Sequence, residues 1–70
     1  MQRTQFKLQG EFIPLNKLLK TTGLCSTGGM AKMVIDDGRV TVDTHTELRK
    51  GCKIRKGQVV GFEGSSIEVV

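Results

Sequence analysis

The segment from Met30 to Val42, MAKMVIDDGRVTV, contains the change of hydrophobic pattern that decides the fold class. Up to Ile35 the apolar residues recur at the spacing of a helix. After Gly38 the spacing becomes two, because Val40 and Val42 alternate with polar residues as in a half-buried strand. We therefore expect a helix that ends at Gly38 and leads directly into a sheet.

Upstream of this segment, the sequence predicts a strand and one further helix. Phe6 and Leu8 are spaced as in a short strand, and an extended segment follows them. We expect a helix over residues 14–22, because Pro14 suits the first helical position and leucines follow at helical spacing. The residues that carry this prediction are Leu15, Leu18 and Leu19, with Gly23 as the left-handed residue that ends the helix.

Two residue pairs mark the start of the helix that ends at Gly38. Ser26 and Thr27 are its N-cap candidates. Gly28 and Gly29 weaken its first turn, where each glycine is less favourable than alanine by roughly 1 kcal/mol. We interpret the glycine pair as allowing another backbone to approach closely. The alternative is a phosphate held by backbone N–H groups at the helix start.

Downstream of Val42 the pattern predicts strands joined by turns. Residues 43–46 are expected to form a turn, and threonine resists positive φ, so Asp43-Thr44 is not expected to be a tight type I′ turn. Residues 59–62 and 67–70 are expected to pair around a turn at 63–66. The expected fold is α+β, with two short helices packed on a small antiparallel sheet in one domain over residues 1–70.

The length of 70 residues limits the kind of function this chain can perform. A domain of this size buries only about 60% of the surface that its unfolded chain exposes, so its core is thin. A deep substrate pocket would use up most of that core. No nucleophile, base and orienting residue can be grouped in the sequence, so we expect no catalytic residues and no enzyme activity.

The cysteines and the histidine do not indicate a metal site. Cys25 and Cys52 stand far apart and His45 is the single histidine, whereas structural zinc needs about four ligands. The first residues lack the apolar stretch of a signal peptide, and no apolar run is long enough to span a bilayer. We therefore expect a cytoplasmic protein with free thiols, no cofactor and no membrane partner.

The positive charge is concentrated in one part of the chain. The formal net charge is +4, and the fifteen residues from Leu48 to Phe62 contain five basic side chains and no acidic one, a local charge of +5. The rest of the chain therefore sums to 4 − 5 = −1. A local basic patch on a small domain is typical of a polyanion-binding surface. The alternative is a solvated hairpin that serves solubility alone.

From Glu11 to Val70 the order and spacing of several short motifs resemble a known family, the RNA-binding domain first defined in small-subunit ribosomal protein S4, also called the alpha-L motif. Within the family, the chain looks most like a stand-alone bacterial type of similar length. The motifs that carry the resemblance are Leu15-Asn16-Lys17-Leu18-Leu19, Gly23-Leu24 with Thr27, Ala31-Lys32 with Ile35, Gly38-Arg39-Val40-Thr41-Val42, Arg49-Lys50-Gly51 and Gly57-Gln58-Val59-Val60.

The resemblance implies a groove for RNA between the second helix and the following sheet loop. Two arginines common in the family are replaced here by Pro14 and Gly28, which implies that other residues contact the phosphates. The residues expected at the RNA interface are Lys32, Arg39, Arg49, Lys50, Lys53, Arg55, Lys56, Thr27 and Gly28. Thr27 is also expected to cap its helix.

The aromatic residues bear on the kind of RNA. Phe6, Phe12 and Phe62 are the only aromatic side chains, and their strand positions predict that all three belong to the core. Few bases can then be stacked, so we expect a monomer that binds structured RNA, such as ribosomal or transfer RNA, by backbone shape. A small-molecule substrate is not expected. The alternative function is a protein-interaction adaptor whose basic hairpin binds an acidic partner.

Overall fold

The computed structural model describes residues 2–70. Along the chain, two strands come first, two helices follow, and the remaining strands come after the helices. The predicted α+β class is confirmed. The elements in chain order are β1 (Gln2–Phe6), β2 (Ile13–Pro14), α1 (Leu15–Thr21), α2 (Gly28–Asp36), β3 (Val40–Val42), β4 (His45–Thr46), β5 (Lys53–Ile54), β6 (Val59–Phe62) and β7 (Ser65–Val69).

The main sheet has five strands in the order β1-β7-β6-β3-β4. Its hairpins are antiparallel as predicted, but β1 runs parallel to β7, with Thr4 opposite Ile67, so the sheet is mixed. The first and last strands of the chain are thus neighbours. A separate two-stranded sheet joins β2 to β5.

Both helices lie close to their predicted bounds. Pro14 stands just before α1 with extended backbone, and α1 ends before Gly23, which has the expected positive φ of 82°. Thr27 caps α2 as predicted, because its side chain accepts a hydrogen bond from the backbone N–H of Met30 at 3.1 Å. Neither helix in the described part of the chain has the length and apolar character needed to cross a bilayer.

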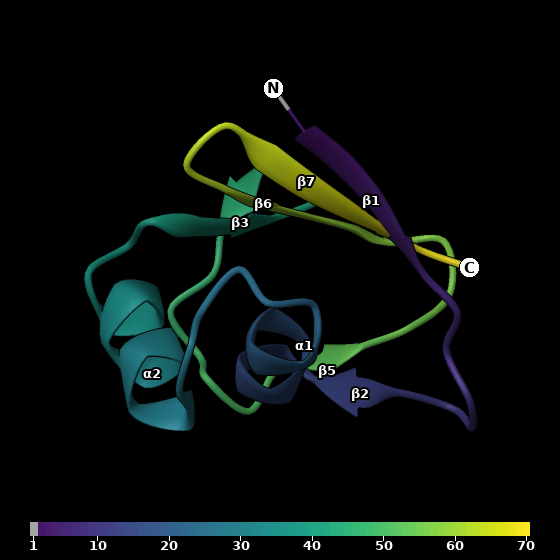
Figure 1. The fold of residues 1–70 in the computed structure, drawn as a ribbon, viewed down its shortest axis with the longest axis horizontal. Coiled ribbons are helices and arrows are strands. Elements are labelled where there is room, and N and C mark those ends of the chain that lie inside the picture. Colours follow the sequence, from purple (N-terminus) through teal and green to yellow (C-terminus); the bar gives the residue numbers. More distant parts are fainter. Residues whose placement is uncertain (1) are drawn as a thin grey trace.

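The core lies between the five-stranded sheet and the two helices (Figure 1). Alternate residues of β3, β6 and β7 point into it, and the leucines of α1 close it from the other side. The short β2–β5 sheet lies beside α1, away from the large sheet (Figure 1). The fully buried large side chains include Leu15, Leu18, Leu19, Ile35, Ile54 and Ile67.

The turn after β3 differs from the expectation. Asp43 has φ 50° and Thr44 has φ 72°, and Val42 pairs with His45, so the strands are joined by the two-residue turn with two positive φ values that we expected to be absent. Tertiary hydrogen bonds stabilise it. The Asp43 carboxylate accepts from the backbone N–H of Val59 at 3.0 Å, and the Asp43 N–H donates to the Val59 carbonyl at 2.8 Å.

Candidate nucleic-acid interface

The basic loop, defined here as residues 49–56, is fixed to the core at its centre. Ile54 of β5 is fully buried and pairs with Ile13 of β2. The loop also closes the start of α1, because the carbonyls of Cys52 and Lys50 accept hydrogen bonds from the backbone N–H groups of Leu15 and Asn16 at 2.9 and 3.1 Å. The loop therefore presents its charged side chains from a defined backbone.

The strand register places two cations of the basic loop against Phe12. Because Ile13 pairs with Ile54 and both point inward, the residues on either side point outward. Lys53 Nζ lies 5.0 Å from the centre of the Phe12 ring, and Arg55 Cζ lies 5.9 Å from it. Both distances are within the range of cation–π attraction.

The prediction that all three phenylalanines belong to the core is wrong for Phe12. Phe62 is buried and Phe6 is partly buried against the core, but 39% of Phe12 is exposed. The sequence gives the reason only once the register of β2 against β5 is known, because Ile13 then takes the inward position beside it. An exposed aromatic ring therefore lies among the predicted phosphate-binding side chains.

Arg49 is already paired with a carboxylate of its own chain. Its Nε donates to Glu47 Oε2 at 3.1 Å, and its backbone N–H donates to the same oxygen at 3.0 Å. These hydrogen bonds lower the pKa of the Glu47 carboxyl to about 2 and raise the pKa of the Arg49 guanidinium. Arg49 remains exposed, but Glu47 offsets its charge at neutral pH.

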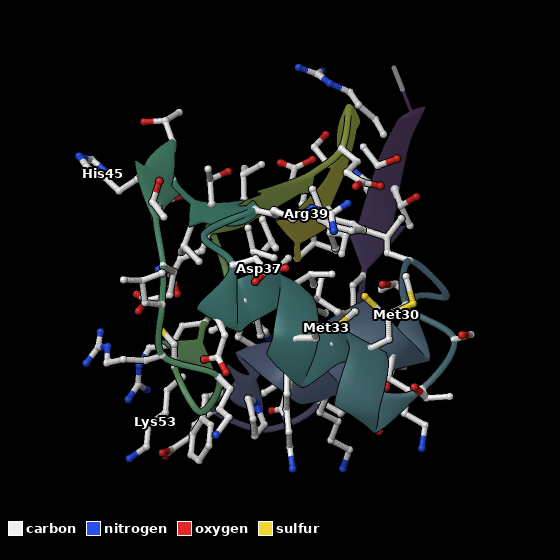
Figure 2. The ribbon with its side chains drawn as sticks, turned by 90° about the vertical axis from the view of Figure 1, so that its left-hand side faces the viewer. Met30, Met33, Asp37, Arg39, His45 and Lys53 are labelled. Atoms are coloured by element: carbon white, nitrogen blue, oxygen red, sulfur yellow. The ribbon has the colours of Figure 1, made fainter. Side chains whose placement is uncertain are left out.

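Arg39 lies apart from the basic loop. It forms a salt bridge with Glu63 and its guanidinium carbon is 5.5 Å from the centre of the Phe62 ring. Figure 2 shows Arg39 beside the sheet, above α2, and Lys53 at the opposite end of the same face. The structure therefore does not bring Arg39 into contact with the other predicted arginines, Arg49 and Arg55.

The start of α2 is open to solvent. A Cβ added to Gly28 would meet nothing within 4 Å, and one added to Gly29 would meet only the Thr27 hydroxyl at 3.9 Å. The expected close approach of another backbone therefore does not occur within residues 2–70. Space remains beside Gly28 for a partner outside this chain, and Thr27 uses its hydroxyl as the helix cap.

The outer face of α2 carries Lys32. Ala31, Val34 and Ile35 point into the core, so Lys32 is exposed as predicted. Met33 is 55% exposed on the same helix, and Figure 2 shows Met30 and Met33 along this face. Lys32 makes no salt bridge within residues 2–70, and the same holds for Lys50, Lys53, Arg55 and Lys56.

The described part of the chain contains two free cysteines and no cluster of metal-ligand side chains. Cys25 is buried, Cys52 is half-buried, and both are free thiols. Burial raises the pKa of both, which keeps them protonated at neutral pH. Among residues 2–70, no three side chains of histidine, cysteine, aspartate or glutamate gather in a way that could hold a metal ion.

Comparisons with known proteins match this arrangement. A model of the S4 domain family matches residues 6–70. The "Putative RNA-binding protein YbcJ" of Escherichia coli (strain K12) is 47% identical over 58 residues, which are 83% of each chain. The "Probable ribosome maturation protein RlbA" of Bacillus subtilis (strain 168) is 38% identical over 61 residues, which are 86% of each chain.

A solved structure shows the same fold. The solution structure of YbcJ from E. coli, described as revealing an alpha-L motif involved in RNA-binding, is similar with a TM-score of 0.75 and 43% sequence identity. The similarity covers 96% of this chain and 86% of that chain. The expected resemblance to the alpha-L motif and to the stand-alone bacterial type is thereby confirmed. With the helices, the mixed sheet and the basic loop in the places described above, the chain belongs to the S4 domain family.

Proposed function

We propose that this protein is a non-enzymatic, monomeric RNA-binding protein that docks its basic loop on structured RNA. The observation that carries the proposal is a group of four cations on a loop fixed to the core, none of which has a carboxylate partner within residues 2–70: Lys50, Lys53, Arg55 and Lys56. Lysine and arginine side chains of this kind neutralise phosphates and supply most of the affinity for nucleic acid. The names of the relatives YbcJ and RlbA support the same class of function.

The remaining predicted residues take secondary places in this proposal. Lys32 and the open helix start at Thr27 and Gly28 extend the surface along α2. Arg39 and Arg49 contact phosphate only by exchanging their present carboxylate partners for it.

The RNA is ribosomal or transfer RNA, and the setting is ribosome assembly or RNA metabolism. The protein acts in the cytoplasm, where thiols such as Cys25 and Cys52 stay reduced.

The first prediction concerns the salt dependence of binding to a hairpin RNA. If Lys32, Lys50, Lys53, Arg55 and Lys56 each neutralise one phosphate, the slope of log affinity against log salt concentration is about −4. Reversing Lys53 and Arg55 together, as Lys53→Glu and Arg55→Glu, removes two of the five phosphate contacts and reduces the slope to about −2.5. Fluorescence anisotropy of a labelled hairpin between about 50 and 200 mM salt measures both slopes.

A matched variant tests whether the loss of affinity comes from the positions of Lys53 and Arg55 or only from the lower net charge. Arg3→Glu with Lys20→Glu makes the same charge change, because each reversal subtracts two and both variants go from +4 to 0. Arg3 and Lys20 are exposed outside the predicted set, so this variant is expected to lose much less affinity. Equal losses in the two variants would contradict a localised interface. Protein partners that survive ribonuclease in a pull-down, with a flat salt slope, would favour the adaptor function instead.

A further inference from the structure

A shallow hollow lies against the exposed ring of Phe12, on the side of α1. Its volume is about 410 Å³, and it lies where the segment between β1 and β2 passes α1. Its walls include Phe6, Leu8, Phe12, Ile13 and Pro14. Lys7 and Lys17 also line it, both are exposed, and no carboxylate is among the lining residues. The hollow therefore combines an apolar wall with positive charge at its edge.

Phe12 belongs to both this hollow and the basic loop. Its ring lines the hollow and also lies 5.0 Å from Lys53 Nζ and 5.9 Å from Arg55 Cζ. Phe12 is the one exposed aromatic side chain among the described residues, since Phe62 is buried and Phe6 is partly buried against the core. An aromatic ring exposed between lysines and arginines is the arrangement that stacks nucleobases in RNA-binding proteins.

We propose that the hollow beside Phe12 binds one unpaired nucleobase of the RNA, which stacks on the Phe12 ring while its flanking phosphates contact cations on both sides. The proposal rests on the proposed function, because it assumes RNA on the basic loop. On the side of the basic loop, one phosphate contacts Lys53 and Arg55. At the hollow, the other phosphate contacts Lys7 and Lys17. The preferred target is then a stem with a bulged or looped-out nucleotide, rather than an uninterrupted duplex.

The chemistry of the surroundings favours a base over other occupants. A base offers a flat apolar face to Phe12 and Pro14 and carries a phosphate on each side, which matches an apolar wall between two pairs of cations. Acidic peptide side chains offer the charge without the flat ring. The walls are held in place by Leu8 and Ile13, which are both buried, so the hollow exists before the RNA arrives.

The experiment compares three hairpin RNAs that differ at one position: a stem with one bulged purine, the same stem with an abasic bulge, and the fully paired stem. The wild-type protein is expected to bind the purine bulge about 5- to 150-fold more tightly than the abasic bulge, the range that stacking of one base on an aromatic ring provides. Replacing the bulged purine with 2-aminopurine gives a direct readout, because its fluorescence changes when the base leaves its neighbours in the stem and stacks on Phe12.

Two variants at one position provide the control. Phe12→Leu keeps an apolar side chain but removes the ring, so it is expected to lose the preference for the purine bulge and the fluorescence change on binding. Phe12→Tyr keeps the ring and is expected to retain both. A wild-type protein that binds all three hairpins equally, or a Phe12→Leu variant that keeps the preference, would overturn the inference and leave the proposed function standing. A wild-type protein that binds none of the three hairpins would overturn both the inference and the proposed function.

Discussion

Low pH is expected to weaken the ion pair between Glu47 and Arg49 of the basic loop. The pKa of Glu47 is lowered to about 2 by hydrogen bonds from Arg49, whereas the unfolded chain protonates a glutamate near pH 4.3. A carboxyl whose folded pKa is depressed stabilises the fold above its unfolded pKa, and this contribution disappears as the pH falls toward the folded value. The ion pair is therefore fully effective above about pH 5 and lost between about pH 4.5 and 2.

The prediction is tested by comparing the wild type with Glu47→Gln. The difference in unfolding free energy between the two proteins is expected to stay constant above about pH 5 and to shrink as the pH falls toward 2. Arg49 is 78% exposed, so the difference is small and decreases further with added salt. Urea unfolding followed by far-ultraviolet circular dichroism measures it. A difference that does not change with pH would show that the pair contributes nothing.

Glu47 also shows what a count of charges along the sequence leaves out. The window of +5 begins at Leu48, one residue after Glu47, and ends at Phe62, one residue before Glu63. These two acids are the ones that pair with Arg49 and Arg39 in the folded chain. Which cations have a carboxylate partner depends on geometry that a count along the sequence cannot include. Four cations of the basic loop remain exposed and make no salt bridge within residues 2–70: Lys50, Lys53, Arg55 and Lys56.

At the scale of elements, local signals predicted the helices and nonlocal contacts decided the rest. The spacing of Leu15, Leu18 and Leu19 predicted α1, and Thr27 predicted the start of α2. Both signals are local, because a helix is stabilised by residues three or four positions apart. The pairing of β1 with β7 joins residues more than sixty positions apart and left no local pattern. The Asp43-Thr44 turn was mispredicted because a distant partner, Val59, stabilises it.

The start of α2 provides a prediction that separates stability from binding. Gly28 lies at a helical position with space for a Cβ, so Gly28→Ala is expected to raise the unfolding free energy by about 0.5 to 1 kcal/mol. If Gly28 lies against the RNA backbone, as we propose, the added methyl group lowers the affinity for the hairpin. Urea unfolding and anisotropy on the same variant measure the two effects.

The control for this prediction is Met33→Ala on the exposed face of the same helix. It also introduces alanine into α2, but away from the N-terminal turn, so the affinity for RNA is expected to change much less than in Gly28→Ala. A Gly28→Ala protein that is more stable and binds RNA as the wild type does would remove Gly28 from the interface. In that case the glycine pair has no role that the structure explains.

At the scale of the whole molecule, the proposed interface and the core are one unit. The basic loop contributes Ile54 to the core, and its carbonyls hold the first N–H groups of α1. The hollow beside Phe12 has walls from the segment before β2 and from α1. Unfolding of this thin core therefore disrupts both parts of the surface, and RNA that binds only the folded chain must stabilise all of it.

Hydrogen exchange of the core amides tests this linkage. Ile67 and Val69 are fully buried in β7, which lies in the five-stranded sheet. At a free hairpin concentration of one hundred times the dissociation constant, amides that exchange through global unfolding are expected to slow about 100-fold. The protein with Lys53→Glu and Arg55→Glu, at the same RNA concentration, is expected to show a smaller slowing that matches its loss of affinity. Slowing confined to the amides of the basic loop would mean that RNA binds a form in which the core is already open, and the interface would then be independent of the fold.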